Sequence, residues 1–134
     1  MQEVKNHTIL YVDDDLDDLQ LLQDAIRKID DQYTIEEAHD GVEAMAKLEE
    51  LKKSKKLPCL IILDINMPKM DGKQTLVAIQ KDEDLASVPV VIFSTSSSVL
   101  DKAFFEKKRV AFITKPVDFQ HFVQVATDLL SYCK

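Results

Sequence analysis

The chain has 134 residues, a hydrophobic fraction of 46% and a net charge of -7, which suit one soluble domain with a continuous core. This acidic balance argues against a nucleic-acid-binding module, because such modules usually carry a basic stripe. No stretch approaches the roughly 18 apolar residues of a membrane span, and the polar N-terminus lacks the apolar centre of a signal peptide. We therefore expect a cytoplasmic protein without membrane contact.

Four short apolar runs recur along the chain at wide spacing. They are residues 9–12, 59–63, 90–93 and 111–113, and each is hydrophobic almost throughout. Near-continuous apolar strands are typical of a parallel sheet that helices cover on both faces. A fifth run, residues 33–38, contains Glu36 and Glu37 and predicts an edge strand with one wetter side.

Helical patterns occupy the segments between these runs. Apolar residues at spacings of three and four predict five helices. The first four are marked by Leu19, Leu22, Ala25, Ile26 and Ile29; by Val42, Met45 and Leu48; by Leu76 and Ile79; and by Ala103, Phe104 and Phe105. The fifth covers residues 119–130, with Asp118 as its N-cap. Strict alternation of strand and helix predicts one α/β domain with an open, doubly wound parallel sheet. G-x-G-x-x-G and P-loop motifs are absent, which excludes typical nicotinamide enzymes and P-loop NTPases.

The two cysteines are far apart in the sequence and belong to no metal-binding spacing. We expect both as reduced thiols. Cys59 should be buried at its strand, whereas Cys133 lies near the C-terminus and can oxidise between molecules in vitro.

Reactive side chains follow four of the predicted strands. Ligand sites of open α/β sheets lie beyond the carboxyl ends of the strands. The sequence therefore predicts one site that gathers carboxylates, hydroxyls and an amine, supplied by Asp13, Asp14, Asp64, Ser94, Thr95 and Lys115.

Acidic residues at the start of a helix also have an ordinary explanation, because they accept hydrogen bonds from free backbone amides. That explanation suffices for the acids that open the first helix, Asp15, Asp17 and Asp18. Asp13 and Asp14 differ, since Asp64 is expected beside them and packed carboxylates raise one another's pKa unless a cation intervenes. Oxygen ligands without nearby His or Cys favour Mg²⁺ or Mn²⁺.

Four motifs at the strand ends occur in a fixed order: Val12-Asp13-Asp14, Leu63-Asp64-Ile65-Asn66-Met67-Pro68 followed by Asp71-Gly72, Phe93-Ser94, and Lys115-Pro116. Together they resemble the motifs of response-regulator receiver domains of two-component signalling. The resemblance covers residues 7–131 or so. It implies a single, stand-alone receiver domain over residues 1–134 without an output domain, and a flavodoxin-like (βα)5 fold with strand order 2-1-3-4-5.

The resemblance also implies roles for the site residues. Asp64 would accept the phosphoryl group, Asp14 would bind the metal directly, and Asp13 would act mostly through water. Asn66 would contribute its backbone carbonyl to the metal and tune dephosphorylation. Lys115 would neutralise the phosphate as a point charge.

Further implied roles concern the segments after the last two strands. The Ser94 hydroxyl would bind the phosphate and act as a switch, and Ser96 would tune dephosphorylation. Phe112 stands where many receivers have Tyr, so a switch there would work through packing; an ordinary core phenylalanine is the alternative. The bond between Lys115 and Pro116 would be cis.

By this resemblance the chain is a phosphorylation switch rather than an enzyme. A histidine kinase or histidine phosphotransfer protein would supply phosphate, and the partner would be a downstream target protein or a second copy bound through the fourth helix, last strand and fifth helix. The resemblance leaves open whether the output is docking on a target or relay of the phosphate to a histidine phosphotransfer protein. A second interpretation is a haloacid-dehalogenase-like phosphatase with Asp13 as nucleophile and Asp15 as acid, but Leu16 stands where that family has Thr or Val. A third is a degenerate receiver that serves only as a binding module.

Overall fold

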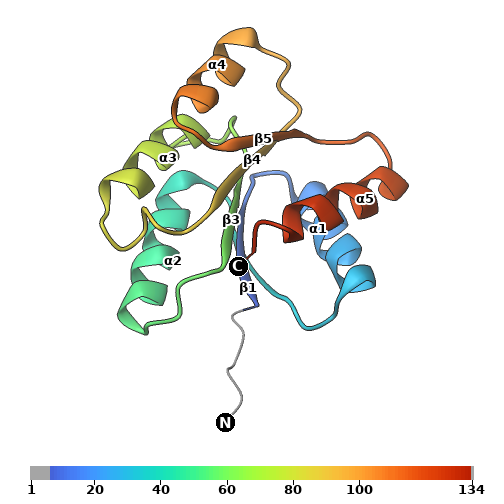
Figure 1. Cartoon of the computed structure of the whole chain (residues 1–134), viewed down its shortest axis with the longest axis horizontal. Coiled ribbons are helices and arrows are strands. Elements are labelled where there is room, and N and C mark those ends of the chain that lie inside the picture. Colours follow the sequence, from blue (N-terminus) through green and yellow to red (C-terminus); the bar gives the residue numbers. More distant parts are fainter. Residues whose placement is uncertain (1–6, 134) are drawn as a thin grey trace.

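The computed structural model describes residues 7–133, which form a five-stranded parallel sheet between helices (Figure 1). The strands are β1 (Thr8–Val12), β2 (Thr34–Ala38), β3 (Leu60–Leu63), β4 (Val90–Ser94) and β5 (Ala111–Thr114). Their order is β2-β1-β3-β4-β5, and every neighbouring pair is parallel. The doubly wound fold and its strand order are confirmed, and β2 lies at an edge as expected.

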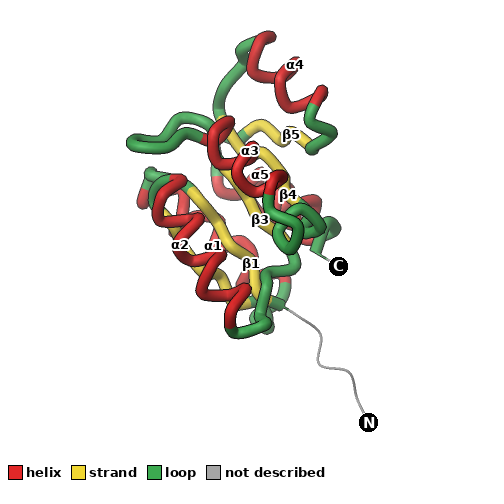
Figure 2. The backbone as a smooth tube through the Cα atoms, turned by 90° about the vertical axis from the view of Figure 1, so that its left-hand side faces the viewer, coloured by secondary structure: helices red, strands yellow, loops and turns green. Residues whose placement is uncertain are grey.

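Five helices alternate with the strands: α1 (Leu16–Ile29), α2 (Gly41–Lys53), α3 (Gly72–Lys81), α4 (Val99–Lys107) and α5 (Phe119–Leu130). Helices α1 and α5 lie on one side of the sheet and α2 and α3 on the other (Figure 1). Figure 2 shows α4 beside β5, at the end of the molecule away from α1 and α2. Within residues 7–133, no helix combines the length and apolar character that crossing a bilayer requires.

The sheet separates two hydrophobic cores, because successive side chains of a strand point to opposite faces. In β1, Ile9 and Tyr11 pack with residues of α1 and α5, whereas Leu10 and Val12 pack with residues of α2 and α3. All four side chains are fully buried. Burial on both faces explains why the strands show no polar alternation.

Each helix begins after a polar residue whose side chain accepts a backbone N–H, and these N-caps are Asp15, Asp40, Asp71, Ser98 and Asp118. The predicted cap at Asp118 is confirmed. Two of the apolar residues that mark the predicted helices are exposed: Ile29 and Val42 lie in terminal turns of α1 and α2 and are 39% and 54% exposed. Spacing identifies a helix, but the packing of its end turns depends on what lies beside them.

Cys59 and Cys133 form a disulfide across 74 residues of sequence, so the prediction of two reduced thiols is wrong for this structure. Cys59 is buried as expected, and its N–H donates to the carbonyl of Thr8 just before β3 begins. Cys133 follows the last turn of α5. The crossovers of the fold bring the end of α5 to the start of β3, and this proximity has no signature in cysteine spacing.

Candidate functional site

The carboxyl ends of β1, β3 and β5 bring charged side chains into one cluster. The Nζ atom of Lys115 lies 2.6 Å from Asp13, 2.8 Å from Asp18 and 3.4 Å from Asp64. Strands β1 and β3 are neighbours, and the N–H of Asp64 donates to the carbonyl of Val12. The parallel sheet therefore places the acids that follow β1 and β3 side by side, with the lysine that follows β5 reaching across.

The acids of this cluster fit a divalent cation. Carboxylate oxygens of Asp13, Asp14 and Asp64 all lie within 4.8 Å of one another. Asp13 and Asp64 are buried, whereas Asp14 is exposed at the rim. A set of oxygen donors without sulfur or imidazole suits a hard cation that keeps part of its water shell. Asn66, whose backbone carbonyl the family resemblance implies as a further ligand, is exposed two residues beyond Asp64.

Asp13 is fully buried, and protein donors engage both of its carboxylate oxygens. The Tyr11 hydroxyl donates to Oδ2 at 2.8 Å, and the N–H of Asp15 donates to Oδ1 at 2.9 Å. Burial, followed by the charge of Asp13, raises the pKa of the Tyr11 hydroxyl, which therefore stays protonated as a donor. Tyr11 is not among the site residues that the sequence predicts. The available signal was one hydroxyl in an aliphatic strand, two residues before Asp13 and so on the same face.

Asp64 ionises less readily than an ordinary aspartate. Burial and then the charge of Asp13 raise its pKa to about 6, although Lys115, the N–H of Ile65 and the Ser94 hydroxyl oppose the rise. Its Oδ1 accepts from the N–H of Ile65 at 2.8 Å, and its Oδ2 faces Lys115. One carboxylate oxygen is thus fixed by the backbone and the other faces the cluster.

Helix α3 packs against the backbone that carries Asp64. The N–H of Gly72 donates to the carbonyl of Ile65 at 2.7 Å. A Cβ at position 72 would overlap the carbonyl oxygen of Asp64 and crowd the Cα of Ile65. Glycine therefore permits the close approach that holds the end of β3 in place.

Ser94 ends β4 and is buried, and its Oγ accepts from the N–H of Ser96 at 3.2 Å. The Ser96 hydroxyl donates to Asp101 at 2.7 Å, and Asp101 forms an ion pair with Lys73 at 2.7 Å. Hydrogen bonds from Lys73 and Ser96 hold the pKa of Asp101 below its usual value. A chain of contacts thus joins the end of β4 to the first turns of α3 and α4.

Phe112 lies half-buried on β5, with its ring centroid 6.1 Å from that of Phe105 and the Nζ of Lys102 5.8 Å above it. These contacts are those of a packed aromatic side chain. The predicted cis bond before Pro116 is wrong, because no peptide bond between residues 7 and 133 is cis. A Lys-Pro sequence does not by itself require cis, since trans is favoured by about 0.5–1 kcal/mol at such bonds.

Lys115 is buried, and burial alone would lower the pKa of its ammonium group. Hydrogen bonds to Asp13 and Asp18, with the charges of Asp64 and Asp13, outweigh burial and raise that pKa. Lys115 is therefore a permanent cation in the cluster. Its partner Asp18 lies at the start of α1, where an acid has an ordinary explanation, and the sequence therefore does not predict this contact.

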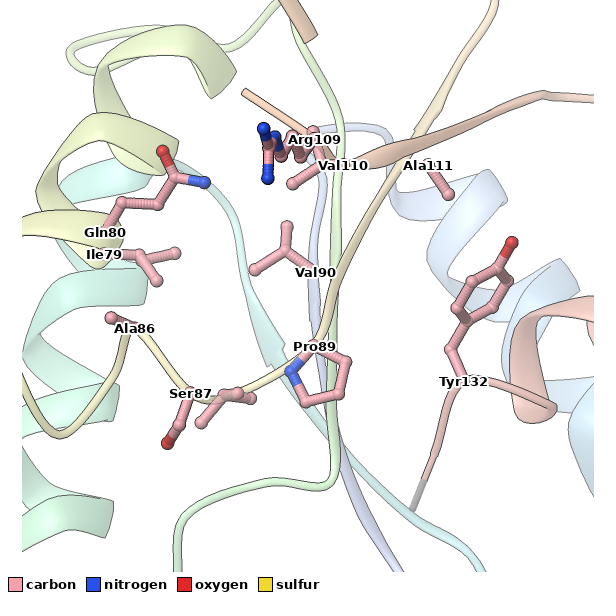
Figure 3. A pocket seen from close by; sticks show the side chains of 11 residues that line it. Ile79, Gln80, Ala86, Ser87, Pro89, Val90, Arg109, Val110, Ala111 and Tyr132 are labelled. Carbon is pink, nitrogen blue, oxygen red and sulfur yellow. The ribbon is translucent and has the colours of Figure 1, made fainter. Parts of the chain in front are cut away.

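A hollow of about 300 Å³ lies at the opposite end of the sheet, between α3, the starts of β4 and β5, and Tyr132 (Figure 3). Apolar side chains such as Ile79 and Val90 line it, with Gln80 and Arg109 at one wall. None of the clustered acids borders this hollow. The chemistry of the chain therefore gathers at the carboxyl ends of the strands.

Comparisons with known proteins agree with this geometry. Residues 9–127 match the response regulator receiver domain. The chain is 31% identical over 128 residues to response regulator Rcp1 of Synechocystis sp. (strain ATCC 27184 / PCC 6803 / Kazusa), covering 92% of this chain and 86% of Rcp1. Similar solved structures include the phosphorylated cyanobacterial phytochrome response regulator RcpA, with 30% identity, 96% and 94% coverage and a TM-score of 0.87. The Mn²⁺-bound form of Rcp1 has 29% identity, 93% and 92% coverage and a TM-score of 0.82.

Proposed function

The chain belongs to the response regulator receiver family, a family of signalling switches, and on that basis we propose that Asp64 accepts a phosphoryl group in two-component signalling. The observation that carries the proposal is the position of Asp64. It is buried at the carboxyl end of β3, with two more acids and Lys115 around it. A carboxylate is a competent nucleophile for phosphoryl transfer when the charge on the phosphate oxygens is neutralised.

The contacts of Asp64 suggest which atom reacts. Oδ1 is bound to the N–H of Ile65, so Oδ2 is the proposed nucleophile. A bond forms between Oδ2 and phosphorus while the bond from phosphorus to the donor's leaving group breaks, and the leaving group keeps the electron pair. Lys115 supplies positive charge to the phosphate oxygens, and the Ser94 hydroxyl donates a hydrogen bond to one of them.

Receiver domains bind a divalent metal, and we propose Mg²⁺, or Mn²⁺ in its place, for this chain. Asp14 and Asp64 would hold the ion directly, with the Asn66 carbonyl, while Asp13 acts through water. When bound, the ion would neutralise charge on the transferring phosphate. The engagement of both Asp13 oxygens by protein donors supports its indirect role.

The proposed donor is a histidine kinase or a histidine phosphotransfer protein in the cytoplasm, and the output is contact with a downstream protein. A phosphate on Asp64 would attract the Ser94 hydroxyl away from the N–H of Ser96. Phe112 would transmit this movement through a change in its packing. Helix α4 offers an exposed apolar start, since Val99 and Leu100 are each 80% exposed. The surface formed by α4, β5 and α5 would carry the signal to a target or to a second copy of the chain.

A phosphatase with Asp13 as nucleophile is the weaker hypothesis. Asp13 is fully buried, and its oxygens already accept from Tyr11, Lys115 and the backbone. Freeing one of them would leave buried donors unsatisfied. At Asp64 Oδ2 the donor is Lys115 at 3.4 Å, a weaker contact than the 2.6 Å that Lys115 makes with Asp13, so less is lost when this oxygen reacts.

The test uses the purified chain with acetyl phosphate, followed by intact mass spectrometry. We expect one phosphoryl group to be added only with Mg²⁺ or Mn²⁺, and Asp64→Asn to abolish the addition. Asp118→Asn is the matched control, because asparagine also caps a helix. Hydroxylamine should release the label, as it does from acyl phosphates. Equal labelling of Asp64→Asn, or a label resistant to hydroxylamine, would refute the proposal.

A further inference from the structure

Asp18 forms an ion pair with Lys115 that joins the first turn of α1 to the end of β5, 97 residues apart in sequence. The two charged atoms are 2.8 Å apart, and the side chains of Lys115 and Asp18 are only 5% and 20% exposed. A pair so withdrawn from water is screened little by salt. It therefore acts on the lysine far more strongly than an exposed surface pair would.

Capping of α1 does not account for Asp18. Asp15 is the N-cap, and its carboxylate accepts the N–H groups of both Asp17 and Asp18. The Asp18 carboxylate is thus not needed at the start of the helix and lies against the lysine instead. Its neighbour Asp17 carries the same charge on the same turn but is exposed, so it provides a matched comparison.

The contacts of Lys115 are unequal. Its distances to Asp13 and Asp18, 2.6 Å and 2.8 Å, are those of strong charge-assisted hydrogen bonds. Its distance to Asp64, 3.4 Å, is at the weak end of the range. The ammonium group is therefore held closer to two acids that do not receive the phosphoryl group than to the one that does.

We propose that Asp18 is a positioning residue that restrains Lys115 and thereby weakens the binding of the phosphoryl donor by Lys115. This inference rests on the proposed function of Asp64. A phosphate at Asp64 must compete with the Asp18 carboxylate for the same ammonium protons, and the Asp18 charge also repels an anionic donor. Since Lys115 contacts the donor phosphate both before and during transfer, the competition acts on donor binding more than on the maximal rate.

The test compares initial rates of phosphorylation by acetyl phosphate at saturating Mg²⁺. Asp18→Asn keeps a hydrogen-bond acceptor but removes the charge, and we expect the KM for acetyl phosphate to fall by about fivefold, with the maximal rate changed by less than about twofold. Asp18→Glu should restore a KM near that of the wild type. Asp17→Asn should leave both constants unchanged.

A second measurement follows the side chain itself in the metal-free protein. Hydrogen bonds to three carboxylates should slow exchange of the Lys115 ammonium protons with water, as seen by NMR of selectively labelled lysine. Exchange should accelerate in Asp18→Asn and stay slow in Asp17→Asn. The same spectra report whether each variant is folded.

The two measurements separate failure of this inference from failure of the proposed function. A wild-type protein that is not phosphorylated on Asp64 refutes the function, while ammonium exchange still tests the contact. If the wild type is phosphorylated but Asp18→Asn shows an unchanged or higher KM, Asp18 does not restrain Lys115. An equal fall in KM for Asp17→Asn would overturn the inference too, because general surface charge would then explain the effect.

Discussion

Asp64→Asn should stabilise the metal-free protein at neutral pH, although it removes the proposed phosphoacceptor. The folded chain holds this carboxyl group in a buried place beside Asp13, and both conditions disfavour its ionised form. Asparagine has nearly the same shape and carries no charge. The substitution therefore relieves the cost of a buried anion while leaving Lys115 its contacts with Asp13 and Asp18.

The size of the effect follows from the pKa of Asp64, which rises from 3.8 to about 6 on folding. Ionisation of this carboxyl group therefore costs about 3 kcal/mol more in the folded state than in the unfolded state, since each tenfold change in an equilibrium constant corresponds to about 1.36 kcal/mol. Asp64→Asn also loses the contact between Lys115 and position 64, which reduces the stabilisation gained by removing the buried charge. We therefore expect a gain of about 1–3 kcal/mol in the free energy of unfolding at pH 7.

The gain should depend on pH in a defined direction. Between about pH 4 and pH 6 the folded state holds a proton on Asp64 that the unfolded state has lost. Asp64 therefore does not lower the free energy of unfolding of the wild type below about pH 4, and that free energy falls as the pH rises through about 6. Asparagine does not titrate, so the difference between Asp64→Asn and the wild type should be smallest near pH 4 and largest near pH 7.

Urea unfolding in the presence of a chelator measures this difference at several pH values, with Asp17→Asn as the exposed control. Added Mg²⁺ should stabilise the wild type, because the cation favours the ionised carboxylate, and so reduce the difference in free energy of unfolding between Asp64→Asn and the wild type. A variant less stable than the wild type at pH 7, or a stability difference that does not vary with pH, would show that the folded protein does not disfavour the ionised form of Asp64.

Three further predictions concern the metal, the end of β3 and the disulfide. Asp14→Ala should weaken Mg²⁺ binding in a metal titration more than Asp13→Ala does, since the first is the proposed direct ligand; the reverse order would exchange their roles. Gly72→Ala should lower the free energy of unfolding by about 1–3 kcal/mol, because the added Cβ meets backbone at Asp64 and not a movable side chain; unchanged urea midpoints would contradict this. Reductant, or Cys133→Ser, should lower the thermal midpoint, since closing a chain segment of 74 residues is worth about 4 kcal/mol in chain-entropy terms; a midpoint insensitive to both would argue that the disulfide does not form in solution.

Local patterns determined much of the fold and the general place of the site. Apolar runs without alternation identify buried parallel strands, and spacings of three and four identify the helices between them. Caps such as Asp118 depend on atoms within a few residues and are visible in the sequence for that reason. The position of Asp64 directly after an apolar run was sufficient to place it at the carboxyl edge of the sheet.

Contacts between distant segments were decided by the tertiary structure. The sequence marks both Asp18 and Lys115 as charged, but only the folded structure brings the first turn of α1 and the end of β5 together, with the two charges 2.8 Å apart. The pairing of Cys59 with Cys133 likewise depends on where α5 ends relative to β3. Periodicity and capping are set by neighbours along the chain, whereas an ion pair or a disulfide depends on the distance between atoms in space. Which acids lie within reach of Lys115 is therefore decided only when the chain has folded.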